Sequence, residues 1–276
     1  MQKILSSHLF VNHRLTAVWL ERIQASGFDA VEIFCARQHI DYWDKAQIRE
    51  LGHWFRESDL KVWSLHAPMY NDEVWGRSGP QAVINITETR KLERAKMVDE
   101  VKRALEIADA IPFRYLIQHI GVRDEEFSEH KLDAAFNSLE ELKAFAGMLD
   151  VEILIENTPN HLSTAARLDH FLNVTHLNLK YCFDVGHAHM GEGIAQEFEI
   201  MQDRISSTHI HDNDGVDDLH LFPLQNEGNI NWSEVMKTLG SRPGQYPLLL
   251  ELKEQPALQH PIEHAKKIAD DLDKLI

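Results

Sequence analysis

The side chains in this sequence that could do chemistry are imidazoles and carboxylates that come directly after short apolar runs. Six runs rich in β-forming residues each end at such a side chain. Imidazole and carboxylate ligands without thiolate are typical of sites for Zn, Mn, Fe or Co, and are less suited to Ca or to soft metals. Bringing them together is costly unless a cation lies among them. The pattern therefore predicts a divalent metal site with ligands drawn from His66, His119, Glu156, Asp184, His211 and Glu251.

Three further residues could complete this site, either as substrate contacts or as outer metal ligands. His187 comes three residues after Asp184. Asp218 and His220 lie two residues apart, in the segment that follows the seventh apolar run. A hydrogen-bonded histidine and a solvated acidic loop are the alternative explanations for these positions. With these residues included, the site could hold one divalent ion, or two or three.

The apolar runs alternate with segments of helical periodicity, and this alternation indicates the elements that position the site. Residues 87–110 carry apolar side chains at helical spacing, and residues 132–142 and 262–272 repeat the pattern. Strands that alternate with helices are typical of parallel βα units, and eight of them in 276 residues match a single (β/α)8 TIM barrel, one α/β domain spanning residues 1–276. The eight runs are residues 3–5, 30–34, 62–65, 115–117, 152–155, 179–183, 207–210 and 248–250.

An open doubly wound sheet is the alternative architecture. No Gly-rich turn of the G-x-G-x-x-G or P-loop type follows an early strand candidate, which argues against it. In a barrel, the C-terminal ends of the strands gather at one mouth, so we expect the ligand candidates to meet there. The long segment 70–86 is expected to cross this mouth as a binding element or lid. Glu32, inside the second run, is interpreted either as an interior hydrogen-bonding group or as a substrate contact.

Five short motifs resemble the xylose isomerase-like TIM barrels, a superfamily that includes sugar isomerases and epimerases, inosose dehydratases and endonuclease IV. They are Leu-His-Ala-Pro at 65–68, Ile-Glu-Asn-Thr at 155–158, Phe-Asp-Val-Gly-His at 183–187, His-Ile-His-Asp-Asn at 209–213 and Glu-Gly-Asn-Ile-Asn-Trp at 227–232. By this resemblance, Glu156, Asp184, His211 and Glu251 match the four ligands of the single divalent ion in ketose 3-epimerases. The resemblance also implies acid and base roles for Glu156 and Glu251, and a substrate contact for His187.

Two reactions are consistent with this resemblance. In the first, a divalent ion chelates the carbonyl and the adjacent hydroxyl of a small sugar, sugar phosphate or keto-polyol, and Glu156 and Glu251 transfer a proton through an enediolate. In the second, the nine residues named above hold the zinc ions of an endonuclease IV-like phosphodiesterase that acts on abasic sites in DNA. We expect the isomerase or epimerase. A metal-stabilised binding barrel without catalysis is a third alternative, and paired glutamates at an open ion argue against it.

The charge balance separates the first two reactions. With 28 Lys and Arg against 44 Asp and Glu, the formal charge is −16 at pH 7. DNA binding depends on cations that neutralise phosphates. Residues 200–221, which contribute to the expected mouth, contain Arg204 against five aspartates. The sequence therefore favours a small-molecule sugar substrate over nucleic acid.

The composition also leads to expectations about the cellular compartment and the oligomeric state of the protein. The two cysteines, Cys35 and Cys182, are ordinary for a reduced, cytoplasmic protein. The first residues show no secretory h-region, and no apolar stretch is long enough to span a membrane. These features predict a cytoplasmic enzyme of carbohydrate metabolism that does not associate with membranes. Barrels of this size often pair, so a homodimer is one of the expected assemblies.

Overall fold

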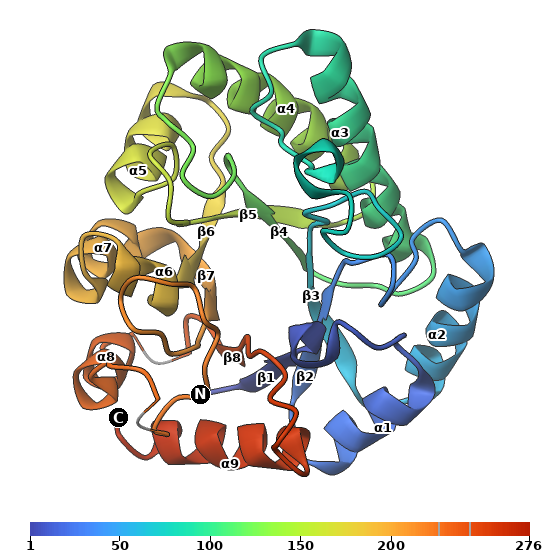
Figure 1. Cartoon of the computed structure of the whole chain (residues 1–276), viewed down its shortest axis with the longest axis vertical. Coiled ribbons are helices and arrows are strands. Elements are labelled where there is room, and N and C mark those ends of the chain that lie inside the picture. The colour runs from blue at the N-terminus through green and yellow to red at the C-terminus, as the bar shows by residue number, and fades with distance from the viewer. Residues whose placement is uncertain (226, 243) are drawn as a thin grey trace.

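Eight parallel strands form the centre of the molecule, and helices surround them (Figure 1). The computed structural model describes residues 1–225, 227–242 and 244–276. The strand order β7-β6-β5-β4-β3-β2-β1-β8 places each strand beside its neighbour in the sequence. The strands are β1 (Lys3–Ser6), β2 (Ala30–Phe34), β3 (Lys61–His66), β4 (Tyr115–His119), β5 (Glu152–Glu156), β6 (Lys180–Asp184), β7 (Ile205–His209) and β8 (Leu248–Leu250).

The barrel closes between β7 and β8. Ile210, the residue after β7, pairs with Leu250 in a parallel bridge. The Ile210 amide donates to the carbonyl of Leu249 at 2.8 Å, and the Ile210 carbonyl accepts from the amide of Glu251 at 3.2 Å. The architecture is therefore the single (β/α)8 barrel that the alternation of runs predicts, and the closure brings Glu251 beside the end of β7.

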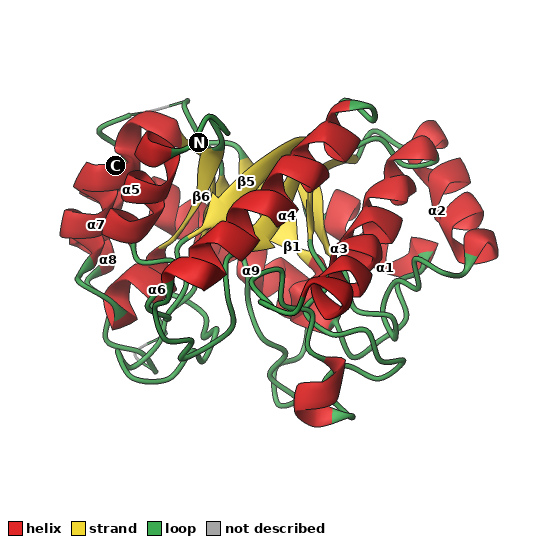
Figure 2. Cartoon of the chain, turned by 90° about the horizontal axis from the view of Figure 1, so that it is seen from above, coloured by secondary structure: helices red, strands yellow, loops and turns green. Residues whose placement is uncertain are grey.

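The helices cover the outside of the strands (Figure 2). Their apolar side chains pack into the core beneath them. In α4, for example, Ala135, Leu139 and Leu142 lie along one face and are completely buried. The segment 87–110, predicted as one helix, contains α3 followed by a short 3-10 turn. The α-helices are α1 (Ala17–Ala25), α2 (Lys45–Glu57), α3 (Lys91–Leu105), α4 (Glu129–Gly147), α5 (Ala165–Val174), α6 (Val185–Met190), α7 (Ile194–Met201), α8 (Trp232–Leu239) and α9 (Pro261–Asp273), and the 3-10 turns are η1 (Ser7–Phe10), η2 (Gly79–Ala82), η3 (Glu106–Asp109) and η4 (Gln202–Arg204).

Truncation of a leucine on this buried face tests the packing. Leu139→Ala is expected to lower the free energy of unfolding by about 2–5 kcal/mol, because it removes buried methyl groups and leaves a cavity. Leu92→Ala is the matched control, since Leu92 is also helical but is 80% exposed. Urea denaturation of the two variants and the wild type measures the difference. Equal losses in both variants would contradict the packing described here.

Long loops gather on the side of the barrel where the strands end (Figure 2). The segment 70–86 forms a closed loop there, because Tyr70 pairs with Val83 in an antiparallel bridge and the Ile84 amide donates to the carbonyl of Met69 at 2.8 Å. A turn of 3-10 helix, η2, lies inside this loop. The loop therefore lies on the face where the sequence predicts a lid.

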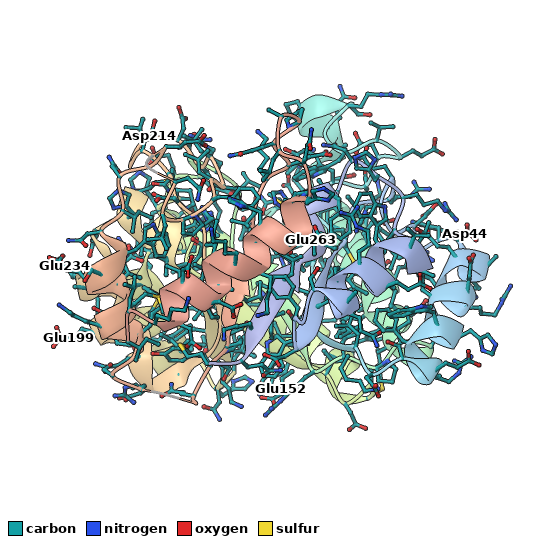
Figure 3. The ribbon with its side chains drawn as sticks, turned by 90° about the horizontal axis from the view of Figure 1, so that it is seen from below. Asp44, Glu152, Glu199, Asp214, Glu234 and Glu263 are labelled. Carbon is teal, nitrogen blue, oxygen red and sulfur yellow. The ribbon has the colours of Figure 1, made fainter. Side chains whose placement is uncertain are left out.

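Most of the acidic residues lie at the surface, and a few are buried. Acids from many different elements lie around the periphery of the molecule (Figure 3), among them Asp44, Glu152, Glu199, Asp214, Glu234 and Glu263. Among the described residues, the buried acids are Glu32, Glu156, Asp184, Glu197, Asp212 and Glu251. The net negative charge therefore belongs mainly to the surface, and the buried carboxylates need a separate explanation. No helix in the described part of the chain is long and apolar enough to span a membrane.

Candidate metal and active site

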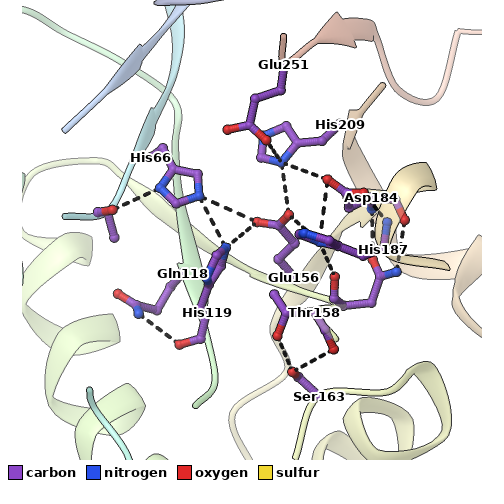
Figure 4. Close-up of polar contacts among 12 residues, drawn as sticks. His66, Gln118, His119, Glu156, Thr158, Ser163, Asp184, His187, His209 and Glu251 are labelled. Atoms are coloured by element: carbon purple, nitrogen blue, oxygen red, sulfur yellow. Dashed lines mark hydrogen bonds and ion pairs between the residues drawn. The ribbon is translucent and has the colours of Figure 1, made fainter. Parts of the chain in front are cut away.

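The last residues of five neighbouring strands meet at the mouth of the barrel (Figure 4). The strands are parallel, and their register pairs His119 with Glu156 and Asp184 with His209. Glu251 follows β8 and joins this set through the closure of the barrel. The strand-end residues are His66 of β3, His119 of β4, Glu156 of β5, Asp184 of β6 and His209 of β7.

His66, His119 and Glu156 form one cluster of ligand atoms. His119 Nε2 lies 3.1 Å from Glu156 Oε2 and 3.3 Å from His66 Nε2. His66 Nε2 lies 3.8 Å from the same carboxylate oxygen. When several ligand atoms each lie about 2.0–2.2 Å from one cation, the distances between those ligand atoms are close to the ones seen here. These three atoms could therefore hold one ion.

Asp184, His187 and His211 form a second cluster. Asp184 is the N-cap of α6, and its Oδ1 accepts the backbone N–H of His187 at 2.6 Å, which fixes the carboxylate. His211 Nε2 lies 3.1 Å from Asp184 Oδ1, and His187 Nδ1 lies 3.5 Å from Asp184 Oδ2. The close approach of His211 requires glycine at 186, because a Cβ there would lie 2.0 Å from the His211 ring.

The loop after β7 brings Asp218 and His220 back to the mouth. Asp212 and Leu221 exchange two backbone hydrogen bonds of 2.9 Å, so the chain between them returns to the place where it left. Asp218 Oδ2 lies 3.2 Å from His187 Nε2 and 3.3 Å from His220 Nε2. His220 has a positive φ of 49°, a conformation that costs energy for a residue with a Cβ. The loop is therefore built to present these two side chains.

Backbone carbonyls fix the orientation of three of the imidazoles. Nδ1 of His66 lies 2.9 Å from the carbonyl of Ala67, Nδ1 of His187 lies 2.9 Å from that of Asn157, and Nδ1 of His220 lies 3.0 Å from that of Glu251. A carbonyl only accepts, so each Nδ1 carries the proton. In a neutral imidazole this leaves the lone pair on Nε2, which faces the cluster. Metal-binding histidines usually have this arrangement.

The site includes two further buried residues, His209 and Glu32. The sequence prediction did not assign either of them as a ligand or a catalytic group. His209 Nδ1 lies 3.0 Å from Glu156 Oε1, 3.3 Å from Glu251 Oε2 and 3.7 Å from Asp184 Oδ2. On its other side, His209 Nε2 lies 3.2 Å from Glu32. Glu32 is therefore an interior hydrogen-bonding group, one of its two expected roles. Residues two apart on a strand share a face, so the spacing of His209 from His211 was a signal for His209.

Burial and neighbouring charges shift the pKa values of the site in opposite directions. Burial raises the pKa of Glu251 to about 8, although His209 and His220 act to lower it. Burial also acts to raise the pKa of Glu156, but His209 and His119 outweigh it and hold this pKa well below its usual value. Burial lowers the pKa of His220, but Asp218 outweighs it and raises that pKa to about 9. The two glutamates of the site therefore have pKa values shifted in opposite directions.

The donor set is suited to a divalent cation. Asp218 Oδ1 and His211 Nδ1 are buried without a hydrogen-bond partner among the described residues. An ionised carboxylate oxygen in that position is costly unless a cation compensates it. Cys182 also lies near Glu156 and His209, but burial raises the pKa of its thiol and keeps it protonated. The residues present therefore fit a cation bound by nitrogen and oxygen.

Two cavities open onto the ligand clusters. The first, of about 290 Å³, is lined by the loops that follow β3, β4 and β5. The second, of about 250 Å³, is lined by the loops that follow β1 and β8, and Glu251 borders it. His66, His119, His187 and Asp218 line both cavities. Glu156 borders neither and lies one layer deeper, completely buried.

Comparison with known proteins places the chain in a family. The model of the family described as xylose isomerase-like TIM barrel matches residues 20–275. This chain belongs to the xylose isomerase-like TIM barrel family. Among its relatives, the uncharacterized protein MJ1311 of Methanocaldococcus jannaschii is 29% identical over 245 residues, which cover 85% of this chain and 78% of the relative.

Solved structures with this barrel include sugar epimerases. A D-tagatose 3-epimerase-like protein matches with a TM-score of 0.77 and 26% identity, over 99% of this chain and 97% of that one. A D-psicose 3-epimerase with D-tagatose, from Clostridium cellulolyticum H10, has a TM-score of 0.72 and 15% identity, over 99% and 98% of the two chains. The IolI protein with a zinc atom has a TM-score of 0.74 and 18% identity, over 99% and 96%. The last two likenesses, at under 25% identity, show a shared barrel fold.

Proposed function

We propose that this chain is a divalent-metal-dependent isomerase or epimerase of a small sugar, sugar phosphate or keto-polyol. One observation carries the proposal: carboxylate oxygens of Glu156, Asp184 and Glu251 lie within 4.8 Å of one another in a buried group, and His211 Nε2 lies 3.1 Å from Asp184 Oδ1. Two glutamates at one centre are what removal and return of a proton at carbon require. The likeness to the D-tagatose 3-epimerase-like protein supports the same class of reaction.

Residues at the mouth of the barrel would bind the metal ion. Glu156, Asp184, His211 and Glu251 would hold the ion, and His66 and His119 add ligand atoms beside Glu156. When bound, the ion would polarise the substrate carbonyl and so acidify the neighbouring C–H bond.

Proton transfer would fall to the two glutamates. Glu251 borders the second cavity, whereas Glu156 would exchange its contact with His119 for one with the substrate. One glutamate removes the proton from the carbon next to the carbonyl. The other returns a proton to the opposite face or to the neighbouring carbon, so the substrate gains and loses no atoms.

Exclusion of water would come from the loop over the mouth. Met69, Tyr70 and Ile84 line the first cavity, and Met69 and Trp75 line the second. These apolar side chains come from the loop that Tyr70 and Val83 close. A reaction centre covered in this way protects a carbanion-like intermediate from solvent.

A multi-metal phosphodiesterase is the second candidate, because the ligand atoms form several overlapping clusters and not one. Such a site could activate water and stabilise both oxygens of a displacement. The first cavity opposes a DNA substrate. Arg123 lines the first cavity, but its guanidinium pairs with Asp217 at 3.1 Å. A nucleic-acid groove would need unpaired cations at this place.

Metal analysis combined with a substrate screen tests the proposal. Protein purified without chelator is expected to contain about one divalent ion per chain, and to incorporate solvent deuterium into a ketose such as D-tagatose or D-fructose in D₂O, as measured by NMR. Chelator-treated protein is the control and should show no exchange. Two or three ions per chain, no deuterium incorporation and cleavage of an abasic-site duplex would favour the phosphodiesterase. Absence of metal, with no gain in thermal stability on adding Mn, Co or Zn, would contradict both.

A further inference from the structure

His209 lies beside both glutamates of the proposed proton transfer but has no role in that transfer itself. It is completely buried at the end of β7 and borders neither cavity at the mouth. Carboxylates from four strands or strand ends surround it, those of Glu32, Glu156, Asp184 and Glu251, at 3.0–3.7 Å. Such an environment is costly for an imidazole unless each nitrogen has a defined partner.

One side of the His209 ring is anchored to Glu32. The Nε2 atom lies 3.2 Å from Glu32 Oε2, and the Ser64 hydroxyl donates to the same oxygen at 2.7 Å. Glu32 on β2 and Ser64 on β3 are register partners in the sheet. All three residues are completely buried. Two strands therefore hold the Glu32 carboxylate, and the carboxylate holds the ring.

The other side of the ring faces both glutamates of the proposed proton transfer. His209 Nδ1 lies 3.0 Å from Glu156 Oε1 and 3.3 Å from Glu251 Oε2. An ionised carboxylate can only accept, so the hydrogen bond needs the N–H of His209 as its donor. The two glutamates come from opposite sides of the barrel closure, on β5 and after β8. His209 is the described side chain that contacts both of them at hydrogen-bond distance.

We propose that His209, anchored by Glu32, is the positioning residue that fixes Glu156 and Glu251 relative to each other. The inference rests on the proposed function for its kinetic consequence. Two buried carboxylates repel each other, and an N–H that contacts both offsets this repulsion and fixes their orientation. Among the described residues, Ser64 and His209 are the hydrogen-bond partners of Glu32, so we expect Glu32 to act on the two glutamates through His209. Second-layer hydrogen bonds of this kind orient metal ligands and catalytic groups elsewhere.

Two variants test the positioning role. Glu32→Gln keeps the shape of the anchor and removes its charge, whereas His209→Asn removes the Nε2 that contacts Glu32 and leaves an unanchored amide near the position of Nδ1. We expect both variants to retain the wild-type number of bound ions. Both should bind Co²⁺ about 10- to 100-fold more weakly in a chelator competition. Their kcat, measured with the ketose that the wild type exchanges, should fall by a similar factor. KM should change by less than about 2-fold, since substrate contacts are not altered. The double variant should be no slower than His209→Asn alone, because one effect acts through the other.

A buried histidine outside the site provides the matched control. His39 is also completely buried and contacts Ser7 Oγ at 2.9 Å, but it borders neither cavity. His39→Asn is expected to lower thermal stability without changing Co²⁺ affinity or kcat. If His209→Asn does not fold, Glu32→Gln provides the same readouts.

Three results would overturn the inference. Wild-type Co²⁺ affinity and kcat in Glu32→Gln would show that the anchor has no role. Loss of one ion in His209→Asn, with none lost in Glu32→Gln, would make His209 a metal ligand. A rise in KM at constant kcat would make it a substrate contact. If the wild type exchanges no ketose, the proposed function fails, and Co²⁺ affinity still decides whether His209 positions the two carboxylates.

Discussion

Replacement of Glu156 by glutamine is expected to lower kcat for ketose exchange by about 10³-fold, within the range that general acid–base groups contribute. Glu156 Oε2 contacts His119 Nε2 at 3.1 Å, and Glu156 Oε1 contacts His209 Nδ1 at 3.0 Å and His187 Nδ1 at 3.3 Å. Glutamine keeps the volume of the side chain but loses the charge and one acceptor, and its NH₂ group faces nitrogen donors. Steady-state kinetics and metal titration of the folded variant measure the effect.

Glu152→Gln is the matched control for this experiment. Glu152 begins the same strand, β5, but is exposed at the opposite end and pairs with Lys180 at 2.7 Å. Its replacement should change kcat by less than about 2-fold, because exposed ion pairs contribute little. A Glu156→Gln enzyme with wild-type turnover would place the reaction elsewhere. Since both candidate reactions need Glu156, this variant tests where the reaction occurs, and the metal content and substrate screen test which reaction it is.

The barrel and the strand-end ligands could be predicted because each depends on a short-range pattern. Parallel strands repeat as apolar runs, and a residue that ends such a run must lie at the mouth once the strands form a barrel. His66, His119 and Asp184 illustrate this, since each is the last residue of its strand. The chain order then places His66 beside His119 on neighbouring strands, with Asp184 on the far side of β5.

The interior partners of the site could not be predicted in the same way. His209 is the last residue of β7, but in the sequence it lies inside the apolar run 207–210. Its contacts come from β2, β5 and the end of β8. Which carboxylates surround a buried imidazole depends on barrel register and closure, which a linear pattern does not contain. Asp218 and His220, which the sequence does indicate as candidates, reach the mouth because Asp212 pairs with Leu221. That bridge depends on loop geometry and not on periodicity.

Gly186→Ala is expected to weaken divalent metal binding by about 100-fold without altering any ligand. A Cβ at 186 would lie 2.0 Å from Cε1 and 2.5 Å from Nδ1 of His211. The His211 ring is completely buried and stacks on His220 with ring centroids 4.1 Å apart, so it cannot move without displacing a second side chain. Alanine normally stabilises a helix relative to glycine by about 1 kcal/mol. Here we expect a loss of about 1–3 kcal/mol instead, because the core is overpacked.

Two further variants separate the steric effect from a general effect of alanine. Gly147→Ala, at the end of α4, is expected to be neutral or slightly stabilising, because no atom lies within 4 Å of the added Cβ. In the double variant Gly186→Ala/His211→Ala, removal of the ring should restore thermal stability but not metal affinity. Chelator competition and thermal unfolding of the same samples give both quantities. Wild-type metal affinity in Gly186→Ala would contradict the assignment of His211 as a ligand, whereas recovery of stability in the double variant would show that the ring and the added methyl group compete for one space.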